Sequence, residues 1–175
     1  MYRATKGADP IYKQWAQLNI KGIYDCMGYA YIGPLASFEA WRQGLVRGPT
    51  DLLYNASFIG NKIKKTGRFT DVYQNGGWGT ARDVGTAAFT MALSYVFQAN
   101  QNDRATLLDR INKHIAWIVG KGTKNTQSFV CGFNDGPTSA HYRTNGWKAV
   151  PGGVVAGPDP QGNWQDNGQR YEFTE

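Results

Sequence analysis

Two consecutive helical patterns joined by a short link constrain the fold of this chain most strongly. From 82 to about 99, apolar and small residues recur at helical spacing, which predicts a helix with a broad buried face. Asn102 and Asp103 then predict the cap of a second helix, which Gly120 and Gly122 end. Because the link is only a few residues long, we expect the two helices to pack side by side and antiparallel.

The remainder of the chain combines shorter helical patterns with long loops. Helical patterns are expected at 9–22, at 38–45 and, as a short helix or strand, at 51–60. Residues 61–80 predict a polar, glycine-containing loop, and residues 123–170 are rich in glycine and proline and lack periodicity. A loop region this long inside a compact domain is usually functional. We therefore expect helical hairpins that carry long loops at one end.

Composition bounds the class of protein. With 175 residues, of which 41% are hydrophobic, the chain is expected to be globular and to form one domain. Aromatic residues reach 14%, which suits either an aromatic core or a carbohydrate-binding surface, and composition does not choose between them. His114 follows a helical pattern near Trp117, and we expect it to be structural.

The formal net charge is +6 at pH 7, but the basic residues are mostly scattered. One cluster, formed by Lys62, Lys64, Lys65 and Arg68, suits a solvated loop better than a nucleic-acid site. No stretch approaches the roughly 18 apolar residues that a membrane span needs, and the residues after Met1 lack the apolar run of a signal peptide. We therefore expect neither nucleic acid nor a membrane as a partner.

Several kinds of site are excluded or left open by the residues themselves. The motifs of serine hydrolases, zinc proteases and phosphate-binding loops do not occur, and the two histidines lie too far apart in sequence to favour a zinc site. Cys26 and Cys131 are expected either to pair in an oxidising compartment or to be buried thiols. Asn55 begins an N-glycosylation sequon, which has meaning only in a protein secreted by a eukaryote.

Two segments combine aromatic, charged and glycine residues at distinctive spacings. The first reads Trp78-Gly-Thr-Ala-Arg82, in which we expect Trp78 and Arg82 to lie one helical turn apart. Their side chains would offer a stacking face and a hydrogen-bond donor together, although Trp78 equally suits the core. The second segment, 128–143, passes through a Gly-Phe turn and ends in His141-Tyr-Arg143, whose side chains can donate to sugar hydroxyls.

A third segment gathers carboxylates and aromatic rings near residue 175. It begins with Gly153-Val-Val-Ala-Gly157-Pro158 and leads to Trp164-x-Asp166-x4-Tyr171-x3-Glu175. Carboxyl groups of this kind serve as general acids in glycoside hydrolysis. In this order, the three segments resemble the C-terminal part of the catalytic domain of glycoside hydrolase family nine, the family of many endo-β-1,4-glucanases.

The resemblance implies an all-α fold, namely the later half of an (α/α)6 barrel, with residues 1–175 forming a single partial catalytic-type domain. It implies inverting hydrolysis of β-1,4-glucosidic bonds, with Glu175 as the general acid and Asp166 as a second catalytic-site carboxylate that positions the loop or a substrate hydroxyl. Glu172 is the alternative carboxylate, a solvated one in the first turn of a helix. The implied glucan contacts are His141, Arg143, Trp78, Arg82, Trp164 and Tyr171, with packing as a rival role for both Trp164 and Tyr171.

Departures from the family pattern define the alternative function. Tyr142 stands where the family usually has a second histidine, and the chain has no Asp-Ala-Gly-Asp stretch, which in the family carries the water-activating aspartates. We therefore expect another segment or chain to complete the barrel, or else a non-catalytic relative that binds polysaccharide or serves in assembly. The resemblance also implies an extracellular protein. Calcium is common in the family, although no ligand for it can be assigned and the chain itself requires no cofactor.

Overall fold

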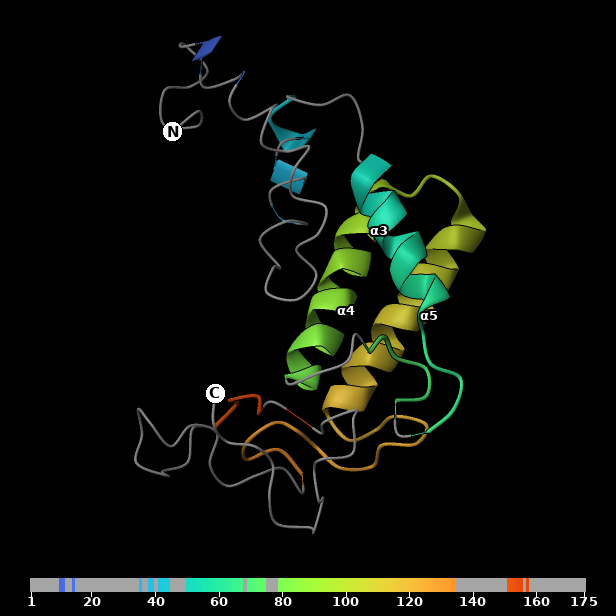
Figure 1. Ribbon diagram of the computed structural model, residues 1–175, viewed down its shortest axis with the longest axis vertical. Coiled ribbons are helices and arrows are strands. Elements are labelled where there is room, and N and C mark those ends of the chain that lie inside the picture. Colours follow the sequence, from blue (N-terminus) through green and yellow to red (C-terminus); the bar gives the residue numbers. More distant parts are fainter. Residues whose placement is uncertain are drawn as a thin grey trace.

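The computed structural model describes residues 10, 11, 14, 35, 38, 39, 41–44, 50–67, 69–74, 79–134, 151–155 and 157, with backbone only for 50–55. Three helices form the body of this part: α3 (Thr50–Asn61), α4 (Thr80–Phe97) and α5 (Gln101–Ile118). As Figure 1 shows, α4 and α5 run antiparallel side by side, and α3 packs against α4. The described residues contain no strand, only isolated β-bridges, so the predicted all-α class is confirmed.

The helix pair agrees with the prediction, but both helices begin earlier. α4 starts at Thr80 rather than at residue 82, because Gly79 adopts a left-handed conformation (φ 83°) that turns the chain into the helix without a side-chain cap. The cap of α5 is Asn100, not the predicted Asn102 and Asp103. The Asn100 side chain accepts hydrogen bonds from the backbone N–H groups of these two residues, at 2.9 and 3.3 Å.

The shorter elements settle two open expectations. Residues 50–61 form the helix α3, so the helical alternative for this segment is correct. Phe38 and Trp41 lie in the expected helical stretch and contact Phe97 at the end of α4, with ring-centroid distances of 5.4 and 4.3 Å. These contacts tie a segment that precedes α3 to the end of α4.

Two clusters of buried side chains make the core, one toward each end of the helix pair. The first joins the start of α4 and the end of α5 to the loops; it comprises Val72, Ala81, Val84, Trp117, Phe129, Cys131 and Val155. The second joins α3, α4 and α5; it comprises Ala56, Ile59, Tyr73, Ala87, Met91 and Leu107. Trp117 is fully buried and contacts the rings of Phe69 and Phe129 at 5.4 and 4.7 Å. Part of the high aromatic content therefore serves the core.

His114 fixes the loop after α3 onto α5. Its Nε2 accepts a hydrogen bond from the backbone N–H of Tyr73 at 2.9 Å, and its Nδ1 lies 2.7 Å from the carbonyl oxygen of Arg110, to which it donates. Burial lowers the pKa of His114 to about 4, so the ring is neutral at pH 7. The expectation that His114 is structural is confirmed.

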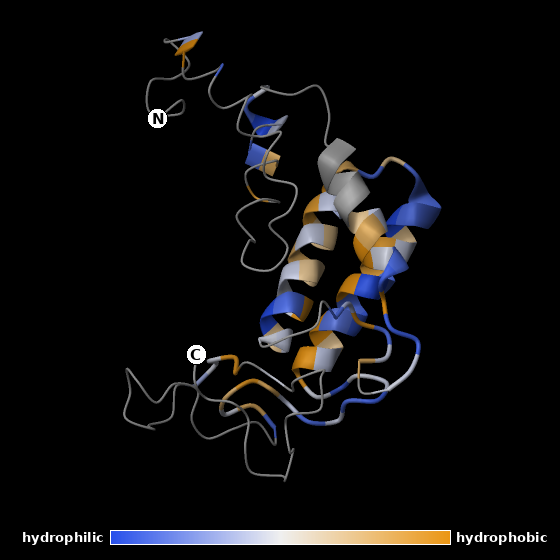
Figure 2. Cartoon of the chain, viewed as in Figure 1, coloured by the Kyte–Doolittle hydropathy of each residue, from blue (hydrophilic) through white to orange (hydrophobic). Residues whose placement is uncertain are grey.

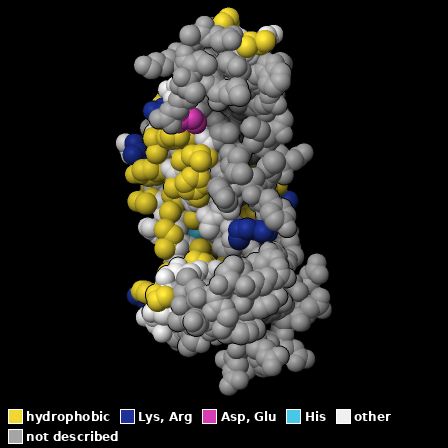
Figure 3. All heavy atoms as spheres, turned by 90° about the vertical axis from the view of Figure 1, so that its left-hand side faces the viewer, with side chains coloured by type: hydrophobic (Ala, Val, Ile, Leu, Met, Phe, Trp, Pro, Cys, Tyr) yellow, Lys and Arg dark blue, Asp and Glu magenta, His cyan; other side chains and the backbone are white. Residues whose placement is uncertain are grey.

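The face of α4 away from α5 carries exposed apolar side chains. Phe89 is 38% exposed and Val96 is 60% exposed. Hydropathy colouring shows α4 as mostly white to orange beyond its first turn, whereas α5 carries blue stretches (Figure 2). In Figure 3 hydrophobic side chains gather on the corresponding face of the molecule. None of the helices that the structure describes is long and apolar enough to cross a membrane.

Candidate functional site

Described residues of the second and third segments are joined by backbone hydrogen bonds. The N–H of Cys131 donates to the carbonyl oxygen of Gly153 at 2.7 Å, and the N–H of Gly152 donates to the carbonyl oxygen of Cys131 at 2.9 Å. Two residues further along, the N–H of Val155 donates to the carbonyl oxygen of Phe129 at 3.0 Å. Residues some twenty positions apart in sequence therefore run beside each other.

The third segment also reaches the first, at the beginning of α4. Gly157 has a φ of +84°, and a Cβ atom built on it would lie 2.9 Å from Oγ1 of Thr80 and 3.1 Å from the backbone nitrogen of Ala81. Only glycine allows the chain this conformation and this close an approach to the first turn of the helix. Val155 packs in the same buried cluster as Ala81, which holds the crossing in place.

Arg82 lies in this first turn. Its side chain is 33% exposed, and Nη2 lies 3.5 Å from Oδ1 of Asp83, which is almost fully buried. A Cβ on Gly79 would lie 3.1 Å from the same Nη2, so the guanidinium group folds back over the N-cap. The first turn of α4 therefore presents a partly accessible cation that lies close to the N-cap and near a buried carboxylate.

The charge of Asp83 shapes the electrostatics around this turn. Burial raises the pKa of Asp83, and the neighbouring Arg82 partly offsets that rise. Burial also raises the pKa of Tyr73, with a further contribution from the nearby Asp83 carboxylate. Neither Asp83 nor Gly157 stood out as a site residue in the sequence, although Asp83 directly follows Arg82 and Gly157 lies in the run before Pro158.

Of the predicted site residues, Arg82 alone falls within the part of the chain that the structure describes. The others lie outside it; they are Trp78, His141, Arg143, Trp164, Asp166, Tyr171 and Glu175. α4 begins at Thr80 with Gly79 as its N-cap, so the structure does not test the predicted helical spacing from Trp78 to Arg82. What the structure brings together is the described portion of each segment, namely 79–82, 128–134, and 153–155 with 157, at one end of the α4–α5 pair.

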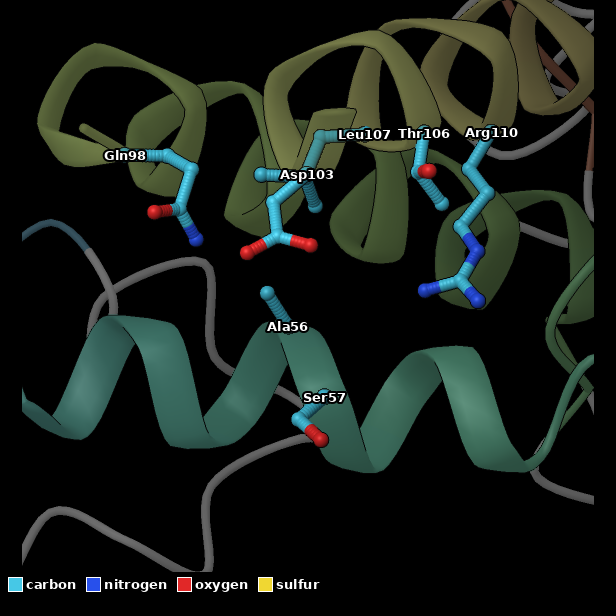
Figure 4. A pocket seen from close by; sticks show the side chains of 7 residues that line it. All are labelled: Ala56, Ser57, Gln98, Asp103, Thr106, Leu107 and Arg110. Atoms are coloured by element: carbon cyan, nitrogen blue, oxygen red, sulfur yellow. The ribbon is translucent and has the colours of Figure 1, made fainter. Parts of the chain in front are cut away.

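A separate cavity of about 210 Å³ lies between α3 and α5. It is lined by Ala56, Ser57, Gln98, Asp103, Thr106, Leu107 and Arg110. Figure 4 shows Asp103 and Arg110 extending from α5 toward α3, the helix that carries Ala56 and Ser57. None of the described residues of the three segments lines this cavity.

The cysteine and metal expectations can be examined over the same part of the chain. Cys131 is a buried free thiol, in agreement with the unpaired alternative, and Cys26 lies outside the described residues. Within the described ranges, no group of three or more His, Cys, Asp or Glu side chains could hold a metal ion. No calcium ligand is therefore assigned to this part of the protein.

An all-α chain whose loops from three separate segments meet at one end of paired helices has the arrangement that we predicted for part of an (α/α)6-barrel glycosidase. Comparison with protein families identifies it further. The profile of Glycosyl hydrolase family 9 matches residues 31–175, and the chain belongs to this family. Comparisons with curated proteins and with solved structures found no match.

Proposed function

We propose that the chain acts as the C-terminal portion of the catalytic domain of an inverting endo-β-1,4-glucanase. In this proposal Glu175 donates a proton to the glycosidic oxygen as the bond to the anomeric carbon breaks. A carboxylate from another segment or chain, roughly 6.5–9.5 Å away, removes a proton from the water that attacks the opposite face. The products are two shorter glucans, with the anomeric configuration inverted at the new reducing end.

The observation that carries the proposal is the meeting of the described parts of the three segments at the beginning of α4. The backbone hydrogen bonds between Cys131 and residues 152–153, and the close approach of Gly157 to Thr80, hold the described parts of the second and third segments against each other and against the first turn of α4, which carries Arg82. An inverting glycosidase requires such a gathering, because the acid and the sugar contacts must converge on one bond.

Arg82 has the chemistry of a substrate contact. Its guanidinium group has five N–H donors, and the backbone at Gly79 together with the Asp83 carboxylate restricts its orientation. A pre-oriented donor loses little conformational entropy when it binds a sugar hydroxyl or orients a carboxylate. We propose that Asp83 acts as a positioning residue and that Arg82 donates to the glucan.

A pair of variants tests this role of Arg82. We expect Arg82→Gln to lower kcat/KM for a soluble β-1,4-glucan by about tenfold or more, which corresponds to the loss of one charged hydrogen-bond donor. Arg104→Gln removes the same charge from α5, where Arg104 lies over the Tyr95 ring, and we expect it to change kcat/KM by less than about twofold. Equal effects of the two variants would show that Arg82 does not contact the substrate.

The alternative function rests on departures within the motifs, such as Tyr142, which stands where the family usually has a second histidine. A non-catalytic relative would bind glucan and release no reducing ends, even when it is purified with any chain that accompanies it. We also propose an extracellular location, where such a polysaccharide would be met.

A further inference from the structure

Two loops that are far apart in sequence bring lysines together near one carboxylate. Lys64 follows α3, and its carbonyl oxygen accepts a hydrogen bond from the N–H of Asp71 at 2.8 Å. The hydroxyl of Thr123 donates to Oδ2 of the same Asp71 at 2.6 Å. Thr123 lies between Lys121 and Lys124 in sequence. Both of these lysines and Lys64 are exposed, so lysines from the two loops surround this contact. Figure 1 shows the two loops running close together below the lower end of α5.

Other basic residues extend this surface. Lys65 is exposed beside Lys64. Lys113 on α5 is exposed, forms an ion pair with Asp109 at 2.9 Å, and has its pKa raised by that pair and, to a smaller extent, by Asp71. We define the lysine patch as five residues: Lys64, Lys65, Lys113, Lys121 and Lys124. Among the described residues, the carboxylates that these contacts place near the lysine patch are Asp71 and Asp109. The five lysines therefore carry more positive charge than these two carboxylates balance.

The chemistry of the lysine patch selects its partner. Lysine ammonium groups are mobile point charges that attract dense negative charge without the planar, paired geometry of arginine. Among the described residues, none of these five lysines lies over an aromatic ring, whereas single-stranded nucleic acids are typically held by stacking on aromatic side chains. A linear polymer with regularly repeated carboxylates can pair with several of these ammonium groups at once and does not require one fixed orientation.

The lysine patch also continues into the loop that leads to the site. The N–H of Phe129 donates to the carbonyl oxygen of Ile118 at 2.9 Å, and Cys131, two residues further along, pairs with Gly153. We propose that the lysine patch binds an acidic polysaccharide, a polyuronate, beside the place where the three segments meet. This contact goes beyond glucan hydrolysis, and it does not depend on the glucanase assignment.

Binding of the full chain to polygalacturonate, measured by calorimetry over a series of salt concentrations, tests the proposal. We expect Lys65→Gln/Lys124→Gln to weaken binding by about tenfold and to lower the slope of log affinity against log salt by about 1.5. The control Arg42→Gln/Arg104→Gln removes two positive charges away from the patch, and we expect it to change the affinity by less than about twofold. Lys65, Lys124 and Arg42 are exposed, which limits effects on folding, and Arg104 is half-buried over the Tyr95 ring, so urea unfolding of both double variants checks that they fold.

Three outcomes would overturn the proposal. The first is the absence of salt-sensitive binding by the wild type, and the second is equal weakening in both double variants, which would assign the binding to overall net charge. Tighter binding of the wild type to duplex DNA than to polygalacturonate, with the same loss in the patch variant, would assign the patch to nucleic acid. Binding of neutral β-1,4-glucan is measured in parallel; its failure would contradict the glucanase proposal and leave this one standing.

Discussion

Protonation of His114 should limit the stability of the protein in acid. The ring is buried and accepts a hydrogen bond from the N–H of Tyr73, a role that the protonated ring cannot fill. Burial lowers the pKa in the folded state from 6.5 to about 4. As the pH falls through 6.5, the unfolded chain takes up a proton that the folded chain does not, so the free energy of unfolding falls down to about pH 4. The gap between the two pKa values corresponds to about 3 kcal/mol.

Urea unfolding at several pH values between 7.5 and 4 measures this effect. We expect wild type to lose about 3 kcal/mol more than His114→Gln over this range. The glutamine variant should also be less stable at pH 7.5, by about 1–3 kcal/mol, because buried hydrogen bonds are lost. His141→Gln, which changes the other histidine, should keep the pH dependence of wild type. Parallel pH profiles of wild type and His114→Gln would refute this account of His114.

Two further predictions concern the first turn of α4. Gly157→Ala should lower the free energy of unfolding by at least about 2 kcal/mol, because the new Cβ meets Thr80 at a φ of +84°. Gly152→Ala, at a φ of +81° in open space, should cost only about 1 kcal/mol, and equal losses in urea unfolding would contradict the close contact. Asp83→Asn should raise Tm at pH 7. Burial raises the pKa of Asp83 in the folded state, so the folded protein loses stability as the pH rises through that pKa and the carboxylate becomes charged. The gain should vanish in acid, and a lower Tm at pH 7 would contradict it.

The helices were predictable from sequence because their signals are local. Apolar spacing located α4 and α5 to within about two residues, and His114 was correctly expected to be structural. The starts were misplaced for local reasons as well. Gly79 begins α4 through its backbone conformation rather than through a capping side chain, and Asn100 caps α5 two residues before the predicted pair. Asn100, Asn102 and Asp103 are all residue types that cap helices well, so residue type does not tell which of them is the N-cap.

The meeting of the three segments could not be predicted from periodicity. It depends on contacts between distant residues, such as Gly157 with Thr80 and Cys131 with Gly153, which leave no repeating pattern in the sequence. The resemblance to the family supplied the expectation that these segments act together. The buried carboxylate of Asp83 was not expected as a site residue, because burial is a property of the packed structure.

Reducing-sugar release from a soluble β-1,4-glucan tests the central claim most directly, with the protein purified together with any chain that accompanies it. The account predicts that Glu175→Gln lowers the rate by about 100-fold or more, because the leaving oxygen loses its proton donor. Glu172→Gln, which changes a neighbouring carboxylate, should keep a rate within about threefold of wild type. Equal rates for wild type and Glu175→Gln would contradict the assignment of Glu175 as the general acid.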